Sequence, residues 1–133
     1  ESNIAASSPV VLNARNCIFA GQQRDEIIFS DGSRRADPAA FRANIQNSIV
    51  RASDDFAGPD RDWSDFLTDV CQGCYNLQNG DDLFLDIDQD DYRLDTMRVA
   101  IGLGEIIPGL EEDIEGNIRI APVAAGAYAA PAP

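Results

Sequence analysis

The chain has 133 residues, which is enough for one domain with a hydrophobic core and too few for two well-packed domains. Hydrophobic residues make up 44% of it and aromatic residues 8%, values typical of globular proteins, so wholesale disorder is excluded. The longest apolar run, VAIGLGEII, contains Glu105 and is far shorter than a membrane-spanning helix.

The chain is strongly acidic, with 23 acidic and 10 basic residues and a net charge of −13. Residues 1–51 carry a net charge of +1, whereas residues 52–133 carry a net charge of −14. This asymmetry predicts a polarised surface that attracts a basic partner, and it argues against nucleic-acid binding, which needs clustered Lys and Arg. Solubility, or adaptation to a salty environment, is the alternative interpretation.

Two residue types are missing, since the sequence contains no His and all its basic residues are Arg. The absence of His excludes Ser-His and Cys-His nucleophile pairs and imidazole metal ligands. The absence of Lys excludes Schiff-base chemistry and a phosphate-loop lysine. We therefore expect no enzyme, and no cofactor beyond a weakly held divalent cation.

The N-terminal third of the chain predicts a loose arm followed by extended segments. Residues 1–9 are small and polar and indicate a flexible N-terminal arm. Two short apolar runs follow, residues 10–21 and 25–33. They predict either the two strands of a hairpin or extended segments packed on a helical body.

The segment 37–57 predicts a helix of about twenty residues. Asp37 is suited to cap it and Pro38 to occupy its first position, and Gly58 and Pro59 follow its end. Its apolar stripe recurs at helical spacing, at Phe41, Ile45, Ile49, Ala52 and Phe56.

Further helices are predicted over residues 61–78, 90–107 and 109–115. Residues 81–88 alternate in part like a short strand. The Ala/Pro-rich segment 121–133 has no periodicity and predicts an extended, mobile tail that adds little to the core. No internal repeat is evident in the sequence.

The expected fold is therefore mainly α. We predict a small bundle of three to four helices within a single domain, residues 10–120, with an extended or hairpin N-terminal segment and a non-regular C-terminal tail. An α+β fold with a hairpin over residues 10–30 is the alternative.

The run DIDQDDYRLDTM resembles a calcium loop at its start, with Asp86, Asp88 and Asp90 at the first, third and fifth positions. Asp91 then stands where such a loop needs Gly, and Met97 where it needs a bidentate Glu. The favoured interpretation is an acidic helix start capped by Asp88. Weak divalent-cation binding by the first three Asp is the alternative.

Three cysteines allow several pairings. Cys71 and Cys74 form a CxxC motif late in a predicted helix, and Cys17 stands alone. Free core thiols are one interpretation. The other is a disulfide, either from Cys17 to one of the pair, which would stabilise the fold by roughly 4 kcal/mol, or within the pair, which is less favourable geometrically in a helix.

The function predicted from these features is a non-catalytic accessory or structural subunit that docks on a larger assembly. Tyr128 in the tail and the Arg34–Arg35 pair are the candidate partner-binding residues. One such subunit would be an extrinsic subunit on the lumen side of a membrane complex such as a photosystem. The alternatives are an acidic Ca²⁺-binding module and a capsid or filament decoration protein. The first residue is Glu1, so a removed leader is one reading, which predicts a thylakoid-lumen, periplasmic or secreted location.

Overall fold

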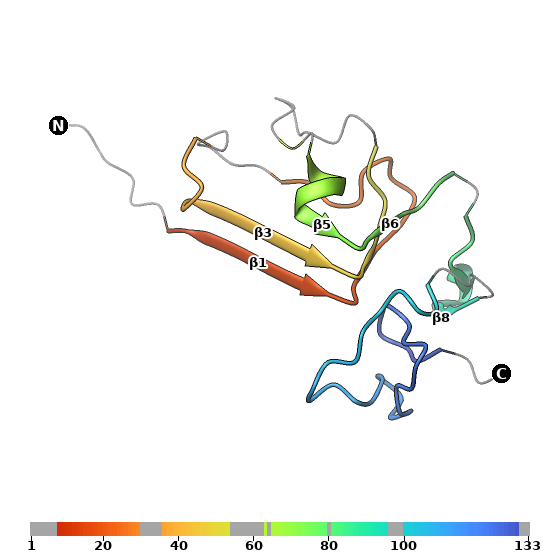
Figure 1. The fold of residues 1–133 in the computed structure, drawn as a ribbon. Coiled ribbons are helices and arrows are strands. Elements are labelled where there is room, and N and C mark those ends of the chain that lie inside the picture. The colour runs from red at the N-terminus through yellow and green to blue at the C-terminus, as the bar shows by residue number, and fades with distance from the viewer. Residues whose placement is uncertain are drawn as a thin grey trace.

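The computed structural model describes residues 8–29, 36–53, 63, 65–79, 81–95 and 100–130. Two parallel sheets hold most of the strands among these residues (Figure 1). The first sheet contains β1 (Val10–Arg15), β3 (Phe41–Gln46) and β5 (Cys71–Gln72). The second contains β2 (Ile18–Phe19), β4 (Ile49–Val50) and β6 (Tyr75–Asn76). Each strand of the first sheet turns a corner into a strand of the second, so the chain stacks one L-shaped unit on the next, as in a short parallel β-solenoid.

The corner of each unit lies at a residue with a left-handed backbone. The angle φ is 52° at Asn16, 49° at Asn47 and 63° at Gly73. Asn and Gly adopt this conformation at the lowest cost, which explains their presence at three stacked positions. The fully buried hydroxyl of Ser48 accepts a hydrogen bond from the backbone N–H of Cys17 at 3.0 Å and so joins two neighbouring corners.

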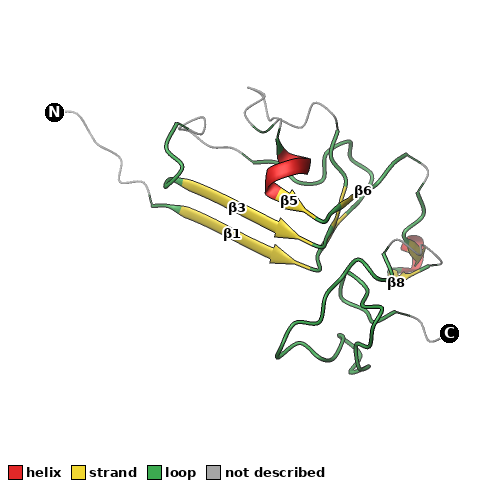
Figure 2. Cartoon of the chain, in the orientation of Figure 1, coloured by secondary structure: helices red, strands yellow, loops and turns green. Residues whose placement is uncertain are grey.

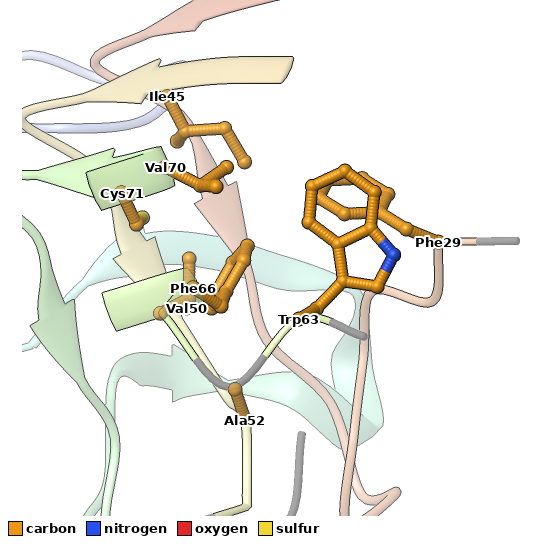
Figure 3. Packing of buried hydrophobic residues seen from close by; sticks show 8 residues of the cluster. All are labelled: Phe29, Ile45, Val50, Ala52, Trp63, Phe66, Val70 and Cys71. Carbon is orange, nitrogen blue, oxygen red and sulfur yellow. The ribbon is translucent and has the colours of Figure 1, made fainter. Parts of the chain in front are cut away.

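A first hydrophobic core lies between the first sheet and the segments that return from one unit to the next (Figure 3). The ring centroid of Phe29 lies 4.9 Å from that of Trp63 and 5.8 Å from that of Phe66, in edge-on geometry. A single π-helical turn, η2 (Phe66–Val70), precedes β5 and forms the larger helical segment in Figure 2. The buried members of this core are Phe29, Ile45, Val50, Ala52, Trp63, Phe66, Val70 and Cys71.

A second core lies between the second sheet and what we call the C-terminal lobe, residues 81–95 and 100–130. The lobe starts with an antiparallel hairpin of β7 (Phe84–Asp86) and β8 (Asp91–Leu94), joined through the 3₁₀ turn η3 (Ile87–Gln89). The rest of its described chain is irregular apart from two isolated bridges. The buried members of the second core are Ile49, Leu77, Leu83, Leu94, Ala100, Ala124 and Ala125.

The prediction of a helix over residues 37–57 is wrong, since the described part, residues 37–53, contains β3 and β4; residues 54–57 lie outside the described residues. Positions four apart share a face of a strand as well as of a helix, because four is a multiple of the strand period of two. Phe41 and Ile45 therefore lie on one face of β3. The Asp37 carboxylate accepts a hydrogen bond from the backbone N–H of Ala39 at 2.9 Å, so it stabilises a turn rather than capping a helix.

The other helices of the predicted bundle are also wrong. The described residues of 61–78 include η2 followed by β5 and β6, and those of 90–107 include β8 and irregular chain. Residues 109–115 form turns and one isolated bridge. The alternative hairpin over residues 10–30 is wrong too, because β1 and β2 pair in parallel with β3 and β4 and not with each other.

Residues 121–130 differ from the mobile tail expected from their composition. Val123, Ala124 and Ala125 are 5%, 1% and 0% exposed and belong to the interior of the lobe. The backbone N–H of Gly102 donates to the carbonyl of Val123 at 2.9 Å, which ties this segment to the start of the irregular region. Within the described part of the chain, no helix is long and apolar enough to cross a membrane.

Candidate functional site

A cleft of about 540 Å³ lies where the second sheet meets the C-terminal lobe. It is lined by β2 with its flanking residues, by the β7–β8 hairpin, and by the loop from residue 125 to residue 128. Its larger side chains are apolar or aromatic: Ile18, Phe19, Phe84, Tyr92, Leu94 and Tyr128. We call this cavity the edge cleft, because one of its sides is an unpaired strand edge.

β2 is the outermost strand of the second sheet among the described residues. The carbonyls of Cys17 and Phe19 each accept a hydrogen bond of 2.9 Å from the β4 side, so these two residues direct their backbone groups toward β4. Alternate residues of a strand direct their backbone groups to opposite sides. The N–H and C=O of Ile18 and the N–H of Ala20 therefore point away from β4, along the side that the edge cleft borders.

The loop of residues 125–128, which lines the other side of the edge cleft, makes one backbone hydrogen bond next to this edge. The backbone N–H of Gly126 donates to the carbonyl of Asn16 at 2.7 Å. The φ angle of Gly126 is 98°, which side-chain-bearing residues rarely adopt, and a Cβ atom there would also lie 2.6 Å from the end of the Ile18 side chain, so glycine is favoured at this close approach. Beyond Asn16, no described residue makes a backbone hydrogen bond to the outer side of β2.

Arg119 fixes the position of that loop. Its guanidinium donates to the carbonyl of Gly126 at 2.9 Å and to that of Ala127 at 3.0 Å. Longer hydrogen bonds of 3.4 Å reach the carbonyls of Ala124 and Tyr128. One charged side chain thus satisfies carbonyls that have no partner in regular secondary structure, and it holds the cleft wall in shape.

Asp113 fixes the same loop from its other end. Its carboxylate accepts a hydrogen bond from the backbone N–H of Ala129 at 2.8 Å and from that of Asn117 at 2.8 Å. Burial raises the pKa of Asp113, but the hydrogen bonds from these amides and from the Asn117 side chain outweigh it, and the pKa falls to about 2. The carboxylate is therefore ionised at neutral pH.

The surroundings of the edge cleft are acidic. A smaller cavity of about 210 Å³ shares Ala20 and Phe84 with it and adds Asp81 and Asp82. At the hairpin, the hydroxyl of Tyr92 lies 3.3 Å from a carboxylate oxygen of Asp90, whose negative charge raises the pKa of the tyrosine. A positively charged residue near either end of the cleft would be favoured.

A second cleft of about 700 Å³ shares Leu94 and Tyr128 with the edge cleft. Leu85, Ile118 and Ile120 line it and are 50%, 68% and 68% exposed. Carboxylates line it as well, at Asp113 and Glu115. Arg93 also lines it, but its guanidinium is held by Asp91 through a 2.8 Å hydrogen bond.

The three aspartates of the predicted cation site lie in and beside η3. Asp86 ends β7, Asp88 lies within η3, and Asp90 ends η3 in the left-handed conformation. Asp88 does not cap a helix here, because the chain continues into β8. Within the described ranges, no group of three or more His, Cys, Asp or Glu has an arrangement that could hold a metal ion. Weak binding of a divalent cation stays a prediction.

The structure joins Cys71 to Cys74 in a disulfide and leaves Cys17 unbonded. The pairing of Cys17 with the second predicted helix is not formed. Cys71 ends η2 and Cys74 precedes β6, so the bond spans the corner at Gly73 instead of lying inside a helix. The geometric objection to this pairing depended on that helix.

Tyr128 is the predicted partner-binding residue that the structure places in a candidate site, since it lines both clefts. Arg34, Arg35 and Met97 lie outside the described residues.

The sequence analysis did not identify two features of the candidate site, Arg119 and the unpaired edge of β2. The only signal for the latter was the recurrence of Asn-Cys-Ile and Asn-Ser-Ile, which marks two corners of the solenoid.

Comparison with family models, with curated proteins and with solved structures finds no match to this chain. The functional argument therefore depends on the geometry of the clefts.

Proposed function

We propose that this chain is a non-catalytic docking subunit that binds an extended segment of a partner protein in the edge cleft. The observation that carries the proposal is the outward-facing backbone of Ile18 and Ala20 beside an apolar cavity. An unpaired strand edge is a template for a further strand, whose main-chain hydrogen bonds supply affinity and whose side chains enter neighbouring pockets.

The partner segment is expected to alternate apolar and basic residues. Apolar side chains suit the aromatic lining, in which Phe84 and Tyr92 pack edge-on with ring centroids 5.4 Å apart. Basic side chains suit the carboxylates of Asp81 and Asp82 beside Ala20, and the net charge of −13 steers a basic segment toward the chain.

The missing His and Lys support a non-catalytic role, because they are two of the side chains most used in acid–base and nucleophilic catalysis. A subunit of this kind belongs on a larger assembly. An extrinsic subunit on the lumen side of a membrane complex, or a decoration protein on a capsid or filament, fits this role. An extracytoplasmic location is proposed with it.

The test uses a fluorescently labelled, capped heptapeptide of alternating Val and Lys, titrated with the protein at physiological salt. We expect saturable binding, measured by fluorescence anisotropy, and much weaker binding of the matched Val/Glu peptide. Ala20→Pro removes an outward N–H without removing a hydrogen bond to β4, so it should weaken binding at least tenfold. Tyr128→Ala should weaken peptide binding as well, because it removes an aromatic side chain that lines the edge cleft.

Val11→Pro is the matched control. Val10 and Asn16 donate their N–H groups toward β3, so Val11 directs its N–H to the free edge of β1, and this variant removes an outward N–H at the other sheet. It should bind the peptide as the parent does. Equal binding by Ala20→Pro, or a loss confined to Val11→Pro, contradicts the edge-cleft proposal, provided that both variants keep the parent melting temperature.

A further inference from the structure

A polar cleft of about 610 Å³ lies at the end of the solenoid units where β4 and β6 finish. We call it the amide cleft, because amide side chains and two arginines dominate its lining: Gln22, Gln23, Arg24, Arg51, Asn76 and Gln78. Among the described residues that line it there is no carboxylate, although the chain has more than twice as many acidic as basic residues. The described lining thus carries two arginines, while the carboxylates of Asp25, Glu26 and Asp81 lie behind it, hydrogen-bonded to lining residues.

The backbone of Arg51 is fixed at this site. Its N–H donates to the carbonyl of Phe19 at 2.9 Å, and its carbonyl accepts a hydrogen bond from the N–H of Glu26 at 3.0 Å. Beside it, the Asn76 side chain donates to the carbonyl of Ala52 at 2.8 Å and accepts from the same residue's N–H at 3.0 Å. The cleft is therefore built on paired strands, and its shape does not depend on a ligand.

The guanidinium of Arg51, in contrast, makes no hydrogen bond or ion pair with any described residue, and its Nε is buried without a partner. Buried N–H groups are nearly always satisfied, because leaving one unpaired is unfavourable. An Arg retained in this state, at the wall of a polar cavity, indicates a group that is supplied from outside the chain.

Three carboxylates beside the amide cleft accept hydrogen bonds from residues that line it. Asp25 accepts a hydrogen bond from the backbone N–H of Ser53 at 2.6 Å and one from its hydroxyl at 3.2 Å. Asp81 accepts from the N–H of Gln78 at 2.7 Å. The Glu26 carboxylate accepts from the backbone N–H of Gln23. No hydrogen bond joins the Arg51 Nε to any of the three, so the guanidinium is available to an anion.

We propose that the amide cleft binds a small hydroxylated carboxylic acid, with its carboxylate on the guanidinium of Arg51. The planar guanidinium matches a planar carboxylate in a two-point hydrogen-bonded pair. Amide side chains such as Gln22 and Gln78 both donate and accept, which suits hydroxyl groups. The cavity volume lies in the range of small-molecule sites, about 300–1,000 Å³.

The test is a calorimetric titration of the full chain with D-glucuronate, with D-glucose as the neutral match and inorganic phosphate as the alternative anion. We expect saturable binding of glucuronate at least tenfold tighter than that of either other probe. Arg51→Gln should lose at least tenfold in affinity, and Arg51→Lys should recover only part of it, because an ammonium cannot form the two-point pair.

Arg42→Gln is the matched control, since it removes the same charge from an exposed residue of β3 outside the cleft. It should leave glucuronate binding unchanged. Without ligand, the Arg51→Gln variant should have a melting temperature no lower than that of the parent, because the guanidinium has no hydrogen-bond partner to lose. A loss of glucuronate binding could then not be ascribed to unfolding.

Tyr128→Ala should keep glucuronate binding, which separates this site from the edge cleft. Absence of saturable binding, equal binding by Arg51→Gln, or equally tight binding of phosphate overturns the proposal.

Discussion

Asn47 shows how one residue maintains the solenoid corner. Its φ of 49° lies in the left-handed region, where a Cβ atom costs about 1–2 kcal/mol for most residues and less for Asn. The next corner stacks directly on it, because a Cβ atom at Gly73 would lie 2.8 Å from the Asn47 side-chain oxygen. The corner therefore requires a small or amide residue at each level.

Substitution of Asn47 tests this requirement. Asn47→Ala should lower the free energy of unfolding by about 1 kcal/mol, because Ala adopts the left-handed conformation less readily. Asn47→Gly should be close to neutral, because the relief of backbone strain is offset by the extra entropy of the unfolded chain. Urea denaturation of both variants gives the comparison, and equal losses in the two would argue against backbone conformation as the cause.

The lowered pKa of Asp113 predicts that the free energy of unfolding depends on pH. Its folded pKa of about 2 lies below the usual value of 3.8, so its contribution is fully present above the unfolded pKa and is lost as the pH falls from about 4 to 2. Asp113→Asn should cost about 1 kcal/mol at pH 7, since solvent screens part of the interaction. The difference between parent and variant should vanish near pH 2. Urea titrations at several pH values measure it, and a difference independent of pH would contradict the assignment.

The corner between β5 and β6 is the element that the disulfide constrains. Cys71 and Cys74 enclose only Gln72 and Gly73, so the loop is short and its closure removes little unfolded-state entropy. We expect reduction to lower the free energy of unfolding by about 2 kcal/mol, half the value for a loop closed by Cys17.

Thiol counting on denatured, unreduced protein distinguishes the pairings. The parent chain should show one free thiol in either case, whereas Cys17→Ser should show none if Cys71 and Cys74 are bonded. Two free thiols in Cys17→Ser would mean that Cys71 and Cys74 do not bond to each other and that Cys17 normally takes part in the disulfide. Three free thiols in the parent would mean that no bond forms in the protein as isolated.

The segment that forms β3 and β4 shows why a helix was predicted where the structure has strands. Phe41, Ile45 and Ile49 satisfy a helical stripe, yet Asn47 interrupts the segment with a corner that no helix contains. Ile49 and Val50 are adjacent and both 0% exposed, and Ile49 lies in the second core whereas Val50 lies in the first. Their burial requires a strand with a core on each side, and the second core is supplied by residues far along the chain.

At the scale of the whole molecule, the C-terminal lobe depends on residues that composition alone marks as a tail. Val123 is 5% exposed, whereas Ile120, which directly precedes this segment, is 68% exposed. Val123→Ala should lower the melting temperature through a loss of about 2 kcal/mol of buried apolar contact.

Ile120→Ala is the matched control and should change stability by less than about 0.5 kcal/mol. Thermal unfolding of both variants tests the role of this segment. Equal behaviour would restore the view that residues 121–133 form an extension outside the folded body, and deletion of that segment would then leave the rest of the chain as stable as before.

The sequence by itself determined the global properties of this protein: its acidity and its lack of His and Lys. It marked Asp37 and Pro38 as the start of an element, but the structure has a turn and a strand there and no helix. These follow from composition and from neighbouring residues. It also singled out Tyr128, which lines both clefts.

Only the tertiary structure decided the fold and the sites. Parallel pairing joins β1 to β3 and β3 to β5 through backbone hydrogen bonds between distant segments, and such pairing leaves no short-range pattern in the chain. The free edge of β2 and the unpaired guanidinium of Arg51 are likewise defined by what surrounds them. Local spacing could not distinguish a helix from a strand at Phe41 and Ile45, because the two periods coincide at every fourth residue and long-range pairing makes the choice.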